Sequence, residues 1–312
     1  MTAVSTTPSE DRIPLGMALL IGFCIVAPML DVCAKLATSE IPVGQITAAR
    51  FLVQTALMLP VCLVLGLSVR LKLDLVPRVA LRALFLLLST YFFIEAIRFM
   101  PLADALAIVF VEPFIILLFG KVMFGELIGP RRLIAAAVGF AGCLLVIQPS
   151  FAAFGYVALF PLGTAFSFAA YILSTRALKD KIHPVEMQFQ TGIIATLMVV
   201  PLVWLADGRG WVSFDPVWPQ GIYWGYLFGV GFFATVAHMM MTYALSMAPA
   251  STLAPLHYLE IVSAAILGYL FFSDFPNGLA LLGVFIIIGS GVYVIHRERV
   301  NARTIHIPTT PI

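Results

Sequence analysis

Two glutamates stand in the middle of long apolar stretches of the sequence, where acids are rare. Glu112 and Glu260 each follow a proline, Pro101 or Pro249, by eleven residues, since 112 − 101 and 260 − 249 are both 11. Nonpolar surroundings favour the neutral form of a carboxyl group, so these acids are suited to bind polar groups of a small solute or to carry a proton. The alternative is that both are neutral and join helices through hydrogen bonds.

Asp31 and Arg50 form a second pair of charged residues within apolar stretches. They lie at similar depths in consecutive stretches, so we expect an ion pair between them. The alternative is that the planar guanidinium group of Arg50 holds the carboxylate or carbonyl oxygens of a bound solute. Replacing Arg50 alone distinguishes the two, because removing one partner of a buried pair destabilises the fold strongly.

Tyr91, Glu95 and Arg98 are spaced i, i+4 and i+7, which places them on one face of a helix. We expect Glu95 and Arg98 to pair near the end of this helix, with the arginine side chain reaching toward a polar interface. The functional alternative is an outer gate or vestibule, with Tyr91 and Glu95 beside the path of a solute.

Two histidines, a tyrosine and a proline complete the set of candidates. His257 lies three residues before Glu260 and is expected to share its helix face. Neither His257 nor His238 belongs to a metal-ligand pattern, and a lone histidine in an apolar helix typically hydrogen-bonds to another helix; contact with a cavity is the alternative. Tyr171 is a candidate stacking surface for a flat heterocycle. Pro113 removes a backbone hydrogen bond and predicts a hinge.

The composition indicates which elements must position these residues. Of 312 residues, 61% are hydrophobic and 11% are charged, with a mean hydropathy of +1.03, whereas a soluble domain carries about 25% charged residues. Lipid must therefore replace water as the outer solvent, and we predict an all-α membrane protein. The four cysteines have no metal-ligand spacing, and the net charge of +2 gives no indication of nucleic-acid binding.

Ten apolar segments have a length near the roughly 20 residues that a helix needs to cross a bilayer. They are continuous rather than alternating in polarity, which favours helices over a membrane β-barrel. The predicted membrane-spanning segments are residues 14–36, 43–69, 79–99, 101–123, 133–148, 154–175, 185–205, 221–245, 253–272 and 278–295.

Lysine and arginine predict the orientation of these segments, because they concentrate in cytoplasmic loops. With the N-terminus inside, fourteen of the 18 basic residues, Arg82 among them, fall on the cytoplasmic side, three fall outside, and Arg50 lies within a segment. We therefore expect both ends to be cytoplasmic, with tails at residues 1–13 and 296–312. The first segment is expected to be retained rather than cleaved as a signal peptide, since no clean cleavage site follows it.

Matching residues recur along the chain at constant separations. Four pairs are separated by 148 residues, namely Pro101 and Pro249, Glu112 and Glu260, Gly120 and Gly268, and Glu126 and Asp274. Two pairs are separated by 141 residues, namely Lys35 and Arg176, and Pro60 and Pro201. Because each copy holds an odd number of spans, the copies must enter the membrane from opposite sides. We therefore predict ten transmembrane helices as two inverted five-helix repeats, residues 14–148 and 154–295, an architecture that many secondary transporters use.

The sequence around the first glutamate resembles a known family. The stretch from Glu112-Pro113-Phe114 to Phe124-Gly125-Glu126, followed by a segment ending Gly139-Phe140-Ala141-Gly142, is similar to the EamA-type signature of the drug/metabolite transporter superfamily. A weaker copy runs from Glu260 to Gly291, so the resemblance covers both repeats. It implies a ten-helix carrier of small organic solutes in the bacterial inner membrane, with a central cavity between the repeats.

The second copy departs from the pattern in two places. Ile261 stands where the first copy has Pro113, and Asp274 stands where the first has Glu126. The substrate contacts of the two halves are therefore not expected to be symmetric. Among members of the family, the whole chain looks most like bacterial riboflavin transporters.

These observations predict a secondary transporter of a small organic metabolite, with riboflavin uptake as the first candidate and export of amino acids or related metabolites as the second. The absence of the GxxxxGK[ST] motif excludes nucleotide hydrolysis of that type by this chain. An intramembrane enzyme would need a nucleophile and base or a metal constellation, and a non-transporting assembly protein would not explain charges buried at matched depths. We expect a small-molecule substrate and the lipid bilayer as partners, no nucleic acid and no cofactor or metal; a homodimer is possible.

Overall fold

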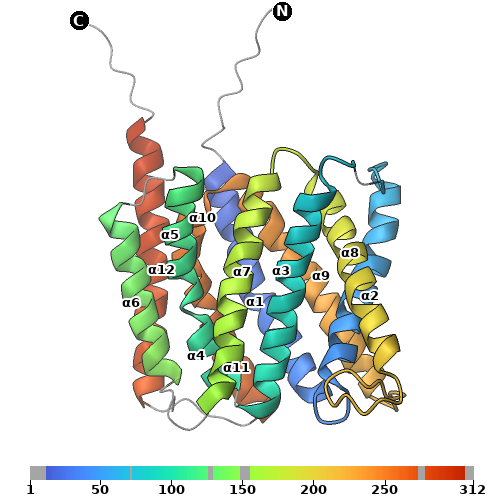
Figure 1. Ribbon diagram of the computed structural model, residues 1–312. Helices are drawn as coiled ribbons and strands as arrows, with labels where there is room; N and C mark the ends of the chain where they lie inside the picture. Colours follow the sequence, from blue (N-terminus) through green and yellow to red (C-terminus); the bar gives the residue numbers. More distant parts are fainter. Residues whose placement is uncertain are drawn as a thin grey trace, which may run out of the picture.

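Figure 1 shows the computed structural model of the chain, in which all regular structure of the described residues is helical. The structure describes residues 12–70, 72–100, 102–125, 129–147, 155–272 and 278–305. The helices run roughly parallel or antiparallel to one another. The start of the first helix, at Ile13, and the end of the last, at Ile305, lie at the same end of the bundle (Figure 1), which we call the terminal end; the other is the opposite end.

The elements follow one another along the chain with short connections. They are α1 (Ile13–Ala37), α2 (Val43–Val64), α3 (Val76–Phe99), α4 (Leu102–Val109), α5 (Glu112–Phe124), α6 (Pro130–Ile147), the 3-10 helix η3 (Gly155–Ala158), α7 (Leu159–Leu178), α8 (Pro184–Ala206), α9 (Tyr223–Met247), α10 (Ala250–Leu253), the 3-10 helix η4 (Ala254–Leu259), α11 (Glu260–Phe272) and α12 (Gly278–Ile305).

These segments form helices because lipid offers the backbone no hydrogen-bond partner, so each segment must satisfy its own N–H and C=O groups. Among the described residues, seven helical stretches are long and apolar enough to cross a membrane: α1, α2, α3, η3 with α7, α8, α9, and the run from α10 to α11. Proline stands in the first turns of α1, α3 and α8, at Pro14, Pro77 and Pro184. The backbone N–H groups of a first turn have no partner within the helix, so a proline there, which lacks an N–H, removes no helical hydrogen bond.

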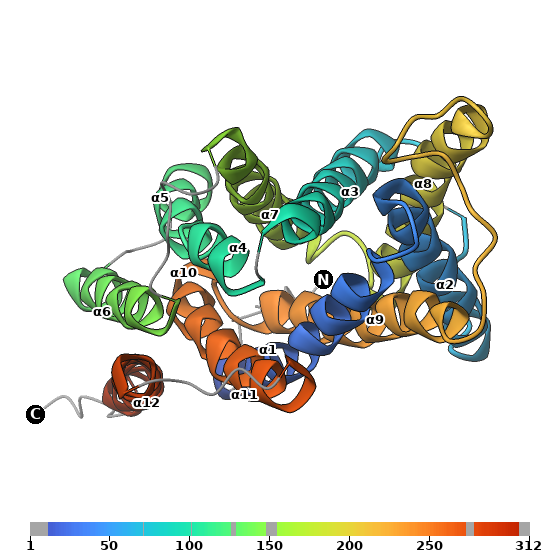
Figure 2. The same cartoon turned by 90° about the horizontal axis from the view of Figure 1, so that it is seen from below.

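The helices are arranged in two rows when the bundle is viewed from below (Figure 2). One row contains α5, α4, α7 and α3, and the other contains α11, α1 and α9. α1 packs along α9, and α3 along α7, so each row combines helices from both halves of the chain. Outside these pairs, α2 packs on α8 and α6 packs on α12.

Two predicted membrane-spanning segments are not continuous helices. Residues 101–123 form two helices, because α4 ends at Val109 and α5 begins only at Glu112. Residues 253–272 contain the 3-10 helix η4, and α11 begins at Glu260. Hydropathy records only that a segment is apolar, and it does not register a change of helix type within one.

The predicted boundaries differ from the structure at other places. α2 ends at Val64 rather than at residue 69, and α12 continues through Ile305, so residues 296–305 are helix and not a loose tail. The run after residue 295 contains arginine, glutamate and alanine, which are strong helix formers. Of the residues that carry the repeat signature, Pro101, Glu126 and Asp274 lie outside the described residues.

The connection between α8 and α9, residues 207–222, covers the opposite end of the bundle beside α2 and α3. Its backbone is held by α2, because Gly44 N donates to Ser213 O at 2.7 Å and the Gln45 side chain exchanges two hydrogen bonds with the backbone of Val217, at 2.8 and 2.9 Å. All four tryptophans of the chain lie between residues 204 and 224, and all four are exposed. Exposed tryptophans gathered at one end are typical of a membrane interface.

Candidate binding cavity

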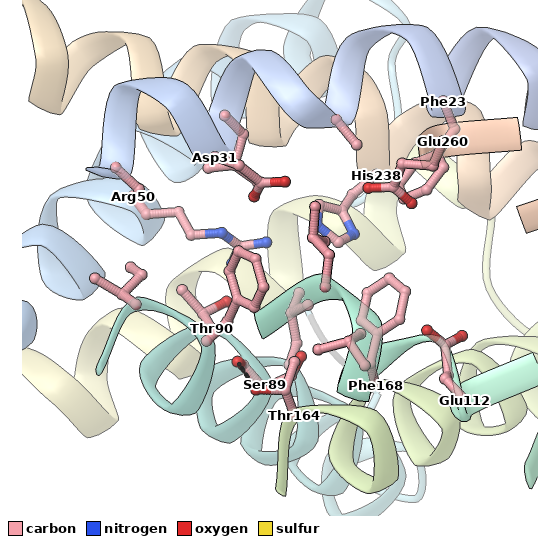
Figure 3. Close-up of a pocket in the computed structure, with 18 of the residues that line it drawn as sticks. Phe23, Asp31, Arg50, Ser89, Thr90, Glu112, Thr164, Phe168, His238 and Glu260 are labelled. Atoms are coloured by element: carbon pink, nitrogen blue, oxygen red, sulfur yellow. Dashed lines mark hydrogen bonds between the residues drawn. The ribbon is translucent and has the colours of Figure 1, made fainter. Parts of the chain in front are cut away.

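A cavity lies between the two rows of helices, in the middle of the bundle. About 730 Å³ of space lies between its atoms, a volume that includes the part open to the outside. Figure 3 shows side chains from α1 and α2 facing side chains from α3, α5 and α7 across it. The polar or charged residues that line it are Asp31, Arg50, Ser89, Thr90, Glu112, Thr164, His238 and Glu260.

Arg50, on α2, is the buried cation of this cavity. Its side chain is 1% exposed, and none of its three guanidinium nitrogens has a hydrogen-bond partner within the described part of the chain. The guanidinium carbon lies 4.4 Å from the centre of the Phe51 ring, a cation–π contact that offsets only part of the lost hydration. A buried arginine with five unused N–H donors is therefore available to a ligand.

Asp31, on α1, points into the same cavity (Figure 3). The predicted ion pair with Arg50 is not formed, because no oxygen of Asp31 lies within the 4.0 Å ion-pair distance of Arg50 and, among the residues described, the guanidinium has no partner at all. The prediction that Asp31 and Arg50 lie at the same depth is confirmed, since both line the cavity, and the prediction that they form an ion pair is wrong. Both charged groups instead line the same space.

Glu112 and Glu260 line the cavity from opposite walls, as Figure 3 shows. Each is the first residue of a helix that starts inside the bundle, α5 for Glu112 and α11 for Glu260. The first turn of a helix leaves backbone N–H groups without helical partners, and it favours a neighbouring carboxylate or other acceptor. The two breaks in the helices therefore bring both acids, and polar backbone, to the centre of the protein.

The two breaks also contact each other. The Tyr258 hydroxyl, on η4, donates to the carbonyl oxygen of Phe110 at 3.2 Å, and the two rings lie 5.8 Å apart. Phe110 follows the last residue of α4, so this bond satisfies a carbonyl group at the break. Tyr258 also fills the space beside Gly139, where a Cβ would lie 2.6 Å from the tyrosine ring.

His257 contacts Glu112, an acid from the other half of the chain. Its Nδ1 lies 3.3 Å from Oε1 of Glu112, and both side chains are buried. His257 belongs to the 3-10 helix η4, and the backbone N–H of Glu260 bonds to the carbonyl oxygen of His257. Residues three apart in a 3-10 turn lie on the same side, as the sequence predicted. Glu260 is half-buried, and no ion pair of Glu260 is found among the described residues.

Aromatic rings form one wall of the cavity. Phe23 and Phe168 stack at 6.5 Å, and His238 lies edge-on to both, at 6.0 and 5.8 Å. Phe23 also stacks on His257 at 5.4 Å. Phe23 and Phe168 were not among the residues predicted from the sequence, although Phe23 lies two helical turns from Asp31 on the same face of α1.

Behind this wall lies a second buried arginine, Arg82 of α3, which is 0% exposed. From the sequence it was counted with the basic residues of the cytoplasmic side, whereas the structure places it in the buried interior of α3, which begins at Val76. Arg82 donates hydrogen bonds to side chains of α7, α8 and α9, namely Thr175, Thr191, Tyr171, Gln188 and Thr242.

Tyr171 connects this network to the cavity. Its hydroxyl accepts from Arg82 at 3.1 Å and lies 3.2 Å from Nδ1 of His238. Tyr171 is itself fully buried and does not line the cavity. It stacks on Phe168 at 5.5 Å, so its contact with a ligand would be indirect.

Tyr91 and Glu95 lie outside the cavity, beneath the connection between α8 and α9. Tyr91 stacks on Phe214 at 5.3 Å, and Glu95 accepts a hydrogen bond from Ser213 at 3.1 Å. Arg98 lies 3.9 Å from Glu95 and also donates to Ser213 at 3.4 Å. The expected pairing of Glu95 with Arg98 is present, with Ser213 as a shared partner.

Pro113 occupies the second position of α5, directly after the break. The sequence predicted a kink within one helix, and the structure has two separate helices instead. Because the proline lacks an N–H, α5 can begin at Glu112 without breaking a hydrogen bond. In the second half Pro255, at the start of η4, stands before the break instead.

The sequence was compared with models of protein families. The model of the EamA-like transporter family matches twice, at residues 14–148 and 155–296. The chain belongs to the EamA-like transporter family. It is accordingly a multi-pass membrane protein that transports a small-molecule substrate, and not an enzyme.

Curated relatives carry the names of transporters with different substrates. The chain is similar to a pseudopaline exporter of Pseudomonas aeruginosa, 28% identical over 89% of this chain and 95% of the relative. It is also similar to a riboflavin transporter of Rhizobium johnstonii, 28% identical over 64% and 63%, and to an S-adenosylmethionine uptake transporter of Rickettsia bellii, 25% identical over 86% and 89%. The relatives therefore agree on transport and differ in substrate and direction.

A solved crystal structure has the same fold. It aligns with a TM-score of 0.76 at 19% sequence identity and covers 91% of this chain and 99% of its own. At this identity the likeness extends to the fold alone.

Proposed function

We propose that this transporter is a secondary carrier that works by alternating access, with ten membrane crossings arranged as two inverted five-helix repeats, residues 14–148 and 154–295. The seven long apolar helices would be joined by three further crossings, α4 with α5, α6 and α12. The cavity between the two rows would open to one side of the membrane and then to the other as the repeats rock against each other.

The packing of the helices supports the repeat. A shift of 141 or 148 residues relates α1 to α7, α2 to α8, α3 to α9, and α6 to α12. Under this exchange the contact of α1 with α9 becomes the contact of α7 with α3, and both contacts are present. α2 packs on its own counterpart α8, as α6 does on α12. In Figure 1 α1 and α7 run in opposite directions, as inversion requires.

Individual contacts support the repeat as well. Phe110 and Tyr258, which meet at the breaks, are separated by 148 residues. Near the opposite end of the bundle, Lys35 of α1 donates to the carbonyl oxygens of Ile97 and Met100 at the end of α3. Near the terminal end, Arg176 of α7 donates to the carbonyl oxygen of Leu245 at the end of α9 at 2.7 Å; 176 − 35 is 141 and 245 − 97 is 148.

The distribution of side chains supports an orientation with both chain ends in the cytoplasm of a bacterial inner membrane. The tryptophans gather at the opposite end, while most lysines and arginines of the loops belong to connections at the terminal end. Short loops rich in basic residues are typical of the cytoplasmic side.

For the substrate, the observation that carries the proposal is Arg50, a buried cation that has no hydrogen-bond partner among the described residues and lies in a cavity walled by Phe23 and Phe168. This arrangement fits a metabolite with a flat ring to stack on the aromatic wall and an edge of oxygen acceptors for the guanidinium. Riboflavin has both features, and riboflavin uptake is the first candidate. Named riboflavin transporters among the relatives support it.

A second candidate is favoured by Asp31. Within the part of the chain that the structure describes, neither the carboxyl group of Asp31 nor the guanidinium of Arg50 has an ion-pair partner. Two such groups in one cavity can bind the ammonium and the carboxylate of an amino-acid headgroup. An amino acid or related metabolite is therefore the second candidate, with export as the direction expected from the sequence. S-adenosylmethionine would combine an amino-acid headgroup with a flat base.

Replacement of Arg50 tests the proposal. Purified protein in proteoliposomes is assayed with labelled riboflavin and, in parallel, with labelled S-adenosylmethionine and a panel of amino acids. Because a hydrogen bond to a charged group contributes about 1.5–3 kcal/mol, Arg50→Gln is expected to lower transport of the true substrate by about 10- to 100-fold. Arg50→Lys is expected to recover part of the activity, since the charge is kept and the planar fork is lost.

Arg98→Gln is the matched control, because Arg98 lies outside the cavity. Unchanged transport by a folded Arg50→Gln protein would overturn the proposed site. Transport of amino acids but not riboflavin would move the assignment to the second candidate.

A further inference from the structure

The hydrogen bonds behind the aromatic wall fix the position of a proton. Arg82 can only donate, since a guanidinium group has no acceptor atom. One of its terminal nitrogens donates to the Tyr171 hydroxyl oxygen at 3.1 Å, and the guanidinium carbon lies 4.6 Å from the centre of the same ring. The Tyr171 oxygen is therefore an acceptor in this contact, and its own hydrogen must point elsewhere.

The Tyr171 hydrogen has one acceptor among the hydrogen bonds of the described residues. Nδ1 of His238 lies 3.2 Å from the hydroxyl oxygen. If Nδ1 carried a proton, that proton and the Arg82 N–H would both point at the tyrosine oxygen, and the hydroxyl hydrogen would be left buried without an acceptor. Nδ1 must therefore accept the bond, and the proton of the neutral imidazole must be on Nε2.

The other ring nitrogen of His238 is free for a ligand. His238 lines the cavity (Figure 3), and within the described residues its Nε2 makes no hydrogen bond. The ring is held edge-on by three others, Phe23, Phe168 and Tyr171, at interplanar angles of 72°, 75° and 79°. These contacts oppose rotation of the imidazole, so Nε2 keeps one direction.

We propose that Arg82, acting through Tyr171, holds His238 as the Nε2-protonated tautomer, and that this N–H is a specificity-determining donor to an oxygen or unprotonated nitrogen acceptor of the substrate. Arg82 and Tyr171 are positioning residues, and His238 is the residue that touches the substrate. The proposal rests on the proposed function in one respect, that the cavity is where the substrate binds.

The consequence is a selectivity for the substrate's acceptor groups. His238 and Arg50 both present donors to the cavity from different helices, α9 and α2. A solute with two separated acceptors satisfies both, whereas an analogue that presents an N–H or a methyl group to His238 leaves a buried donor unpaired. Sites built to hydrogen-bond a substrate reject such analogues strongly.

The tautomer is measured directly, without substrate. Protein labelled with ¹⁵N-histidine is reconstituted in liposomes, and the signals of His238 among the five histidines are assigned by their loss in His238→Gln. Solid-state NMR is expected to show a protonated Nε2 and an unprotonated, hydrogen-bonded Nδ1. A protonated Nδ1 in the wild-type protein overturns the proposal, whatever the substrate is.

Tyr171→Phe keeps the ring and removes the hydroxyl group. The hydrogen bond to Nδ1 is lost, so a mixture of the two tautomers is expected. Tyr243→Phe is the matched control, because Tyr243 packs against His183 and not against His238. A His238 spectrum that is the same in Tyr171→Phe as in the wild type would show that Tyr171 does not set the tautomer.

Recognition is tested by binding of riboflavin and of S-adenosylmethionine to the same preparations. His238→Gln retains a side-chain N–H and is expected to bind within about threefold of the wild type, whereas His238→Leu loses the donor and is expected to bind about tenfold or more weakly. Equal affinity of wild type and His238→Leu overturns the role of His238. If neither compound binds the wild type, the proposed substrates are wrong, while the NMR result still decides the tautomer.

Discussion

Glu112 and Glu260 occupy equivalent places in the two halves of the chain and yet differ in their surroundings. Glu112 is 3% exposed and lies beside His257, whereas Glu260 is half-buried and, in the part of the chain that is described, has no ion-pair partner. Both line the cavity. The difference suggests that Glu260 has the more direct contact with substrate or protons, and Glu112 the more structural role.

Glutamine variants of the two acids separate these roles. Glu260→Gln is expected to lower transport by about tenfold, because one hydrogen bond to a charged group is lost. It is also expected to flatten the pH dependence of transport, because the amide cannot bind and release a proton. Glu112→Gln is expected to have the smaller effect on the pH profile. Transport is measured in proteoliposomes at several pH values. Unchanged rates and pH profiles in both variants would remove the proton role.

Arg82 contributes to stability in addition to its proposed effect on His238. Its hydrogen bonds join α3 to α7, α8 and α9 within the buried interior. Arg82→Met is therefore expected to lower the free energy of unfolding by about 2 kcal/mol, as the loss of hydrogen bonds to a charged group exceeds the relief of desolvation. Thermal unfolding of the purified protein measures this, with Arg98→Met as control. An equally stable Arg82→Met protein would contradict it.

The four charged residues that line the cavity could be predicted from the sequence, because a charge in an apolar segment is costly and marks a candidate for function. Asp31, Arg50, Glu112 and Glu260 were identified in this way. Their contacts could not be predicted, since matched depth along a helix does not fix how two helices are rotated. Arg82 was missed because it lies only six residues after Val76, near the segment boundary where charges are usually exposed.

At the scale of elements, hydropathy predicted the apolar segments and not the breaks within them. Pro113 marked the first break, but the second copy has Ile261 at the matching position and Pro255 instead near its break. The two halves thus contain similarly interrupted helices, although their prolines stand at different positions. Residues 207–222 likewise gave no signal that they would cover Tyr91 and Glu95, because the contact depends on packing between distant segments.

Close packing of α2 and α9 depends on Gly231. A Cβ there would lie 2.3 Å from the Cβ of Val53, whereas a Cβ on Gly225 of the same helix would have nothing within 4 Å. Gly231→Ala is expected to destabilise the protein by about 1–3 kcal/mol through overpacking. Gly225→Ala is the matched control and is expected to be neutral. Thermal unfolding compares the two, and equal stability of both variants would show that the helices separate without cost.

The hydrogen bonds of Lys35 and Arg176 to backbone carbonyl oxygens are expected to hold the cavity closed, each at a different side of the membrane. Lys35 joins α1 to α3 at the opposite end, and Arg176 joins α7 to α9 at the terminal end. Removing either contact is expected to make the cavity open more easily at the end of the bundle where that contact lies. A single cysteine at Ala27, which lines the cavity, reports access once the four native cysteines are replaced.

Lys35→Met is expected to raise the labelling rate of this cysteine by about tenfold or more from the side of the opposite end, because the bonds to Ile97 and Met100 are lost. Arg176→Met is expected to raise it by about tenfold from the side of the terminal end, because the bond to Leu245 is lost. The reagent is a membrane-impermeant methanethiosulfonate applied to vesicles of each orientation. Increases from the same side in both variants would contradict the assignment of the two contacts to opposite gates.

For the whole molecule, the sequence predicted the membrane environment and membership of the EamA family from composition and from the residues around Glu112. The inverted repeat was predicted from constant separations of 141 and 148 residues, and it stays a proposal that the exchange of helix contacts supports. A central cavity between the repeats was expected from the family resemblance, but the set of residues that line it could not be predicted. Its walls come mainly from α1 and α3, and α2, α4, α5, α7, α9 and α11 contribute one or two residues each, so both halves of the chain take part.

Labelling of the Ala27→Cys protein from the two sides of the membrane, with and without riboflavin, is the most direct test of alternating access to this cavity. The cysteine is expected to react with the impermeant reagent from both sides, in right-side-out and in inside-out vesicles, and saturating substrate is expected to protect it in both. Reaction from one side only, under all conditions, would contradict the central claim that one cavity between two inverted repeats serves both sides of the membrane.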